Sequence, residues 1–193
     1  MSAAPVARLS VEEYLKGELT AERPSEYDDG ELFPVVFATI NHARLVNRIS
    51  RRMAERLDRG PCEILSQIRV RLSASKFVLP DQAVVCGAAA VMDETQETIT
   101  NPKVIFEVLS PSARDSDRGG KFELYRQLPS FQEYVLIAQD RAAVEVRRKS
   151  PDGRWIMTFY EGLDSVAKLE SLDIELPLGE LYEGVVLDPK PTP

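Results

Sequence analysis

The spacing of apolar residues along the chain predicts three helices. Between residues 45 and 57 an apolar residue recurs at every fourth position, which is the stripe of an amphipathic helix running from Asn41 to Leu57. A Ser-x-x-Glu capping box at residues 10–13 predicts a short helix over residues 11–17. A third helix is expected from Arg118 to Leu128.

The other apolar stretches predict strands. Residues 63–72 alternate between apolar and polar, as a half-buried strand does, whereas residues 104–109 form the bounded apolar run of a central strand. Pro151-Asp152-Gly153 is the strongest hairpin signal in the chain. We expect strands at 31–37 (an edge strand after a turn at Asp29-Gly30), 63–72, 77–86 (interrupted at Pro80-Asp81), 104–109, 131–138, 143–149, 154–160 and near Ile174.

This order of elements favours an α/β (α+β) fold with a mixed central sheet flanked by helices. A helix and a hairpin precede the sheet, and a C-terminal β-hairpin follows it. The length of 193 residues suits one domain, which we place at residues 1–187. The Pro-rich end, residues 188–193, is expected to be a disordered tail.

Composition limits the classes of protein. Hydrophobic residues make up 44% of the chain and charged residues 28%, as in a soluble globular protein, and the formal net charge of −7 argues against coating nucleic acid by bulk electrostatics. There is no signal-peptide pattern and no apolar run of the roughly 20 residues that a membrane helix needs, so we expect a cytoplasmic protein that contacts no membrane. Cys62 and Cys86 are expected to be reduced core residues rather than a disulfide or a zinc site.

Glu107 stands in the middle of the buried strand at 104–109 and needs compensation there. An ionised carboxylate in an apolar strand is costly unless a cation or several hydrogen bonds stabilise it. By the strand period, Glu107 shares a face with Ile105, and Asp81 shares one with Ala83, so the two acids meet if their strands pair. Hard oxygen ligands suit Mg²⁺ or Mn²⁺, which would relieve the repulsion. Pro80 marks a break in its strand where a pocket can open.

Lys121 is the third candidate. It lies on the apolar stripe of the predicted third helix, which should face the sheet, so its ammonium group needs an anion such as Glu107 or a bound phosphate. Two carboxylates, a divalent metal and a lysine together are suited to hydrolysing phosphodiesters.

Pro80-Asp81 followed by Glu107 is similar to the first two elements of the PD-(D/E)xK nuclease superfamily, whose members have a restriction-endonuclease-like fold. More closely, four blocks at residues 27–31, 80–81, 107–112 and 117–125 resemble the Uma-two family of restriction-endonuclease-like proteins, over about Ser10 to Tyr182. The resemblance implies an αβββαβ core, a Mg²⁺-dependent endonuclease activity and a DNA substrate.

The chain departs from the superfamily pattern at one position. The superfamily has Lys two residues after Glu107, where this chain has Leu109, and the resemblance implies that Lys121 on the following helix replaces it. It also implies an acidic residue ahead of the core that approaches the metal. Glu26 and Glu31 both fit that position, and the sequence leaves both open.

The sequence also offers candidate nucleic-acid contacts and leaves an alternative function open. Arg44, Arg48 and Arg51 are spaced to follow a phosphate backbone, although a solvated helix face explains them more simply, and His42 is a candidate phosphate contact. The alternative to a nuclease is a catalytically inactive module of the same fold that binds nucleic acid or protein. A homodimer formed by the strands after Phe131 is also expected, since Trp155, Met157 and Phe159 share one strand face suited to a core or a dimer interface.

Overall fold

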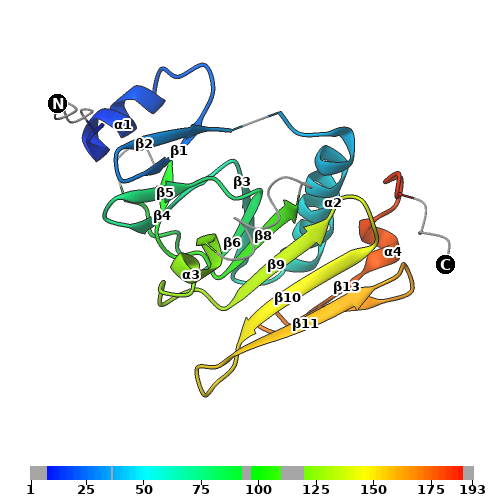
Figure 1. Ribbon diagram of the computed structural model, residues 1–193. Coiled ribbons are helices and arrows are strands. Elements are labelled where there is room, and N and C mark those ends of the chain that lie inside the picture. The colour runs from blue at the N-terminus through cyan, green and yellow to red at the C-terminus, as the bar shows by residue number, and fades with distance from the viewer. Residues whose placement is uncertain (1–7, 36, 93–96, 110–119, 189–193) are drawn as a thin grey trace, which may run out of the picture.

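The computed structural model describes residues 8–35, 37–92, 97–109 and 120–188, and its strands form two main sheets and a small third one (Figure 1). The first sheet has the order β2-β1-β5-β4-β7, the second the order β11-β10-β9-β8-β6-β3, and β12 pairs with β13. The helices are α1 (Val11–Glu18), α2 (Ile40–Leu57), α3 (Phe122–Tyr125) and α4 (Leu178–Leu181). The strands are β1 (Ser25–Asp28), β2 (Glu31–Pro34), β3 (Cys62–Ser66), β4 (Arg69–Ser73), β5 (Lys76–Val78), β6 (Gln82–Cys86), β7 (Thr98–Ile99), β8 (Val104–Leu109), β9 (Glu133–Ala138), β10 (Ala143–Lys149), β11 (Trp155–Glu161), β12 (Val166–Leu169) and β13 (Ile174–Pro177).

One long hairpin belongs to both main sheets. β3 pairs with β6 in the second sheet, whereas β4 pairs with β5 in the first. The predicted strands at 63–72 and 77–86 are therefore each divided in two. Gln67 bends the first with a positive φ of 55°, and Pro80, which has no N–H to donate to a ladder, lies in the break of the second. The mixed α+β architecture is confirmed, but the strands of this hairpin are divided between two main sheets.

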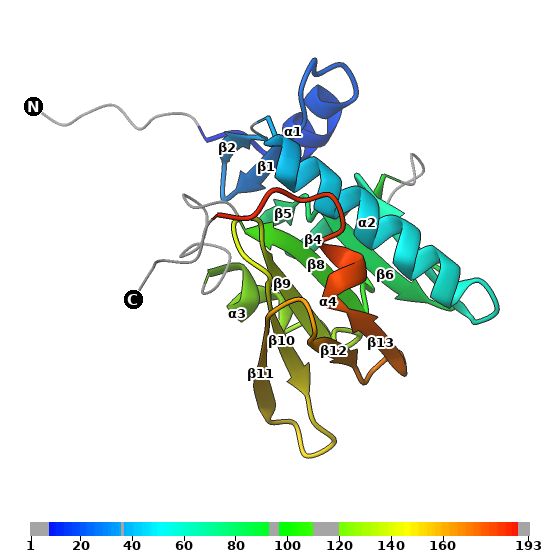
Figure 2. The ribbon, with the colours of Figure 1, turned by 90° about the vertical axis from the view of Figure 1, so that its right-hand side faces the viewer.

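Two apolar clusters cover the two faces of the second sheet. On one face the stripe of α2, with Leu45 and Ile49, packs on Val104 and Phe106 of β8, and β12, β13 and α4 complete the cluster. The other face carries an aromatic cluster around α3, in which Tyr125 contacts the rings of neighbouring residues. Figure 2 shows α2 and α4 together over one face, with α3 on the far side. α1 packs on the first sheet through a separate cluster.

The helix predictions differ in their outcome. The α2 prediction is confirmed to within one residue, and α1 has the predicted capping box, with the Ser10 hydroxyl accepting from the Glu13 amide. The third helix is shorter than expected: α3 spans four residues, and residues 118–119 lie outside the described part of the chain. β12 and α4 were not predicted, because elements of four residues leave too little periodicity. Of the expected tail, the structure describes only Asp188, whose amide donates to the Asp140 carbonyl at 2.8 Å.

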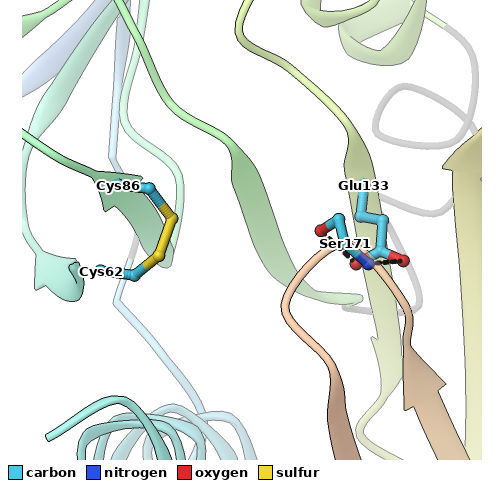
Figure 3. The surroundings of a disulfide bond; sticks show 4 residues. All are labelled: Cys62, Cys86, Glu133 and Ser171. Carbon is cyan, nitrogen blue, oxygen red and sulfur yellow. Dashed lines mark hydrogen bonds between the residues drawn. A yellow bond between two sulfur atoms is a disulfide. The ribbon is translucent and has the colours of Figure 1, made fainter. Parts of the chain in front are cut away.

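Cys62 and Cys86 form a disulfide bond, so the prediction of reduced core cysteines is wrong (Figure 3). The two residues are direct partners in the β3–β6 register, at the first position of one strand and the last of the other. Only the pairing of the strands reveals this proximity, because 24 residues separate the cysteines along the chain. The bond also removes one argument for a reducing compartment. In the described ranges no helix is long and apolar enough to cross a membrane.

Candidate active site

Asp81 and Glu107 lie side by side where the second sheet begins to separate from the first. The β6–β8 register pairs Gln82 with Phe106 and Ala83 with Ile105, and one further step sets Asp81 opposite Glu107. The Val108 amide donates to Asp81 Oδ2 at 2.7 Å, and the Asp81 amide approaches Glu107 Oε2 at 3.4 Å. The two acids therefore have the common face that the strand period predicts.

Lys121 joins acids from both sheets. Its Nζ donates to Glu26 Oε1 at 2.8 Å and lies 3.8 Å from Glu107 Oε1. Glu26 is held from the other side as well, because its Oε1 accepts from the Leu79 amide at 3.1 Å. Lys121 directly precedes α3, so the helix sets its ammonium group between β1 of the first sheet and β8 of the second.

The side chains of this cluster are largely shielded from solvent, and its described groups include more acids than bases. The side chain of Glu107 is 7% exposed, and those of Lys121, Asp81 and Glu26 are 19%, 20% and 22% exposed. Among the residues that the structure describes, three carboxylates accompany one ammonium group, which is a formal charge of −2. Because little water reaches these groups, their repulsion is weakly screened and a divalent cation would offset it.

His42 adds a contact that the sequence did not predict. Its Nε2 lies 3.2 Å from Asp81 Oδ1, and within the described residues its buried Nδ1 has no hydrogen-bond partner. His42 stands in the first turn of α2, beside the cap that the Thr39 hydroxyl forms with the His42 amide. From the sequence, His42 is expected to contact a phosphate. No sequence signal links it to Asp81, which is 39 positions away.

The structure separates the two alternatives for the third acid. Glu26 lies in the cluster, whereas Glu31 is paired with Asp28 at the turn of the β1–β2 hairpin, and β2 is exposed along its length. No interaction described for Glu31 brings it to Asp81 or Lys121. Glu26 is therefore the residue that accompanies the acid pair.

The arginines of α2 lie elsewhere. Arg44, Arg48 and Arg51 line a groove of about 430 Å³ together with Glu183, at the side of α2 that meets the C-terminal segment. Carboxylates already offset two of them: Arg48 pairs with Glu183 at 2.9 Å and Arg51 with Glu55 at 3.0 Å. The residues that line the groove therefore have a net positive charge that nearby carboxylates partly offset.

Carboxylate oxygens, which this cluster provides, are the type of ligand that a hard divalent cation prefers. In the ranges that the structure covers, no cluster of three or more His, Cys, Asp or Glu side chains forms a metal site by itself. Mg²⁺, however, retains several waters and is commonly held by one or two carboxylates together with substrate phosphates. Asp81 and Glu107 provide that pair, and Glu26 lies next to it through Lys121.

The fold is that of a restriction-endonuclease-like protein, and comparison with known proteins gives the family. Residues 11–179 match the model of the family Uma2, described as "Putative restriction endonuclease". The chain belongs to this family.

Two relatives and one solved structure are similar to most of this chain. The uncharacterized protein slr1290 of Synechocystis sp. is 32% identical over 184 residues, covering 94% of this chain and 95% of its own. The uncharacterized protein sll1609 of the same organism is 36% identical over 164 residues, covering 84% and 93%. The crystal structure of a "putative nuclease belonging to DUF820" from Anabaena variabilis superposes with a TM-score of 0.73 at 17% identity, covering 92% of this chain and 99% of that one, which shows a shared fold.

Proposed function

We propose that the protein is a Mg²⁺- or Mn²⁺-dependent endonuclease that hydrolyses phosphodiester bonds in DNA. The observation that supports it best is the position of the Lys121 ammonium, 2.8 Å from Glu26 and 3.8 Å from Glu107, beside the paired Asp81. Membership of a family described as restriction endonucleases agrees with it.

Each residue of the cluster has a role in this proposal. Asp81 and Glu107 would hold the cation, which when bound lowers the pKa of a water and stabilises charge that develops on the phosphate. Lys121 orients the attacking water or a phosphate oxygen, and Glu26 fixes the position of Lys121. His42 orients the Asp81 carboxylate through Oδ1, whereas the Val108 amide donates to Oδ2.

A DNA backbone is the substrate that this arrangement fits. The protein's charge of −7 repels a polyanion at long range, so binding would depend on the bound cation and on local basic residues. Arg44, Arg48 and Arg51 are the candidates for backbone contacts away from the reacting phosphate.

A nicking assay on supercoiled plasmid tests the proposal. With Mg²⁺ or Mn²⁺ the wild type should convert the plasmid to the nicked form, and Glu107→Ala should abolish this. Glu31→Ala is the matched control, since it removes an acid that the structure leaves outside the cluster. Equal cleavage by wild type and Glu107→Ala would refute the proposal.

A second candidate is a binding module of this fold without turnover. The observation in its favour is that the described acids do not form a three-ligand metal site. Calorimetry separates the two candidates: heat of Mn²⁺ binding that is lost in Asp81→Asn supports the nuclease, whereas DNA binding without any Mn²⁺ binding supports the module.

A further inference from the structure

Within the described part of the chain, strand β11 has a hydrogen-bonded neighbour on one side only. It ends the second sheet, where β10 is its sole partner among the described strands. Figures 1 and 2 show the β10–β11 hairpin at the margin of the molecule, reaching beyond the elements that cover the sheet. The pairing with β10 runs from Ala143↔Glu161 to Lys149↔Trp155 without a register shift, so no bulge distorts the edge.

This edge lacks the features that usually protect one. Edge strands are commonly short, charged, bulged or interrupted by Pro. β11 has seven residues, Trp-Ile-Met-Thr-Phe-Tyr-Glu, with one charge and no Pro. Ile156, Met157 and Phe159 are 44%, 58% and 62% exposed, so both faces of the strand present apolar side chains to solvent. Such an edge favours pairing with another strand.

The hydrogen bonds at the two ends of the hairpin show which backbone groups face outward. The Ser150 amide donates to the Arg154 carbonyl at 2.7 Å, and the Gly162 amide donates to the Ala142 carbonyl at 2.9 Å. Antiparallel ladders bond at alternate positions, so the even-numbered residues of β11 bond to β10. The N–H and C=O groups of the odd-numbered residues, from Trp155 to Glu161, therefore point away from the sheet and are available to a further strand.

We propose that a second copy of this chain supplies that strand, with β11 pairing antiparallel to β11 of the partner about a two-fold axis at Thr158. In this register Met157 lies opposite Phe159 of the other copy and Trp155 opposite Glu161, and both pairs use the outward-facing groups. Thr158 faces its own counterpart as a non-hydrogen-bonded pair, and Ile156 faces Tyr160. The full length of both strands is used.

The side chains of β11 complement one another in this register. The five central positions combine Ile or Met with an aromatic residue, or Thr with Thr, pairs that stabilise a sheet by about 0.2–1 kcal/mol each, and only the end pair of Trp155 and Glu161 differs. No two like charges meet, because Glu161 is the only charged residue of β11. A two-fold pairing of identical strands is closed, so it yields a dimer and not a fibre. None of these residues belongs to the acid cluster, so the dimer and the proposed nuclease activity are tested separately.

A cysteine at the axis tests the register. Thr158→Cys should form an interchain disulfide on mild oxidation and run as a covalent dimer, because directly opposed non-hydrogen-bonded residues have Cα atoms about 4.5 Å apart. Ile156→Cys is the control, since its two copies would be four residues apart along the seam, about 13 Å, too far to bridge. The native cysteines are bonded to each other and do not compete. Equal cross-linking of both variants, or of neither, would overturn the proposed register.

Light scattering after size exclusion tests the dimer without any cross-link. The wild type should have twice the monomer mass, and Phe159→Lys should halve it, since two lysines would replace the aromatic members of the central pairs. Leu19→Lys, at another exposed apolar position (56%), should leave the mass unchanged. A wild type that is monomeric, or a dimer that Phe159→Lys leaves intact, would overturn the proposal.

Discussion

Replacing Lys121 by methionine separates the stabilising role of the lysine from its proposed catalytic one. The change removes the ammonium group that lies between Glu26 and Glu107 and keeps a similar apolar stem. Breaking a fully buried ion pair costs about 3–5 kcal/mol. Here the side chains of Lys121 and Glu26, which form the shorter contact, are 19% and 22% exposed, so the pair is only partly buried. The loss should therefore be nearer the roughly 2 kcal/mol of a hydrogen bond between charged groups.

Thermal unfolding and the nicking assay should report this change differently. In a chain of this length about 2 kcal/mol lowers the Tm by about 4–8 °C, whereas loss of a group that stabilises the transition state should slow cleavage by about 10²–10³-fold. Adding Glu26→Gln to Lys121→Met should restore much of the stability, because it removes the unpaired acid, but should not restore cleavage.

Lys168→Met is the matched control for this experiment. Lys168 pairs with Glu175 across β12 and β13 at 3.6 Å, with both side chains more than 60% exposed, so its loss should change stability by less than about 0.5 kcal/mol. If Lys121→Met is no less stable than Lys168→Met and cleaves as fast as the wild type, the account of the cluster is refuted.

Further predictions concern the scaffold. The Cys62–Cys86 disulfide closes a loop of about 25 residues, so its reduction should lower the free energy of unfolding by about 3.5 kcal/mol. Urea unfolding measures this change, and equal midpoints with and without reductant would contradict it. Burial raises the pKa of Glu133 although Ser171 donates to its carboxylate (Figure 3), so the folded state binds its proton more tightly than the unfolded state does. Its contribution is then complete below the unfolded pKa and is lost as the pH rises through the folded value. Glu133→Gln should flatten this decline in unfolding measured against pH, and an unchanged slope would contradict it. Gln67→Val should destabilise the protein by about 1 kcal/mol or more in thermal unfolding, because a β-branched residue fits a φ of 55° poorly; an unaltered Tm would count against a bend at this position.

The parts of the fold and site that were predicted well from the sequence are those that depend only on local periodicity. The apolar stripe of α2 is a property of that segment alone, so its limits followed from spacing. The same holds for the common face of Asp81 and Glu107, which depends only on the alternation of side chains along paired strands. Lys121 was expected to point inward for the equivalent reason, and it does so from the start of a much shorter helix.

Features that depend on long-range pairing could not be predicted. The division of the 62–86 hairpin between two sheets depends on a positive φ at Gln67, which a glutamine does not signal. The contact of His42 with Asp81 requires the packing of α2 against the sheet junction. Likewise, the choice of Glu26 over Glu31 depends on which strand of the β1–β2 hairpin pairs with β5, and both acids look alike in the sequence.

The central claim is that Asp81 and Glu107 together hold a divalent cation, and anomalous diffraction from a crystal soaked in Mn²⁺ tests it most directly. We predict one anomalous peak between the two carboxylates in the wild type and its absence in crystals of Asp81→Asn soaked in the same way. A soaked wild-type crystal with no peak at this pair, or a peak that persists unchanged in Asp81→Asn, would contradict the claim.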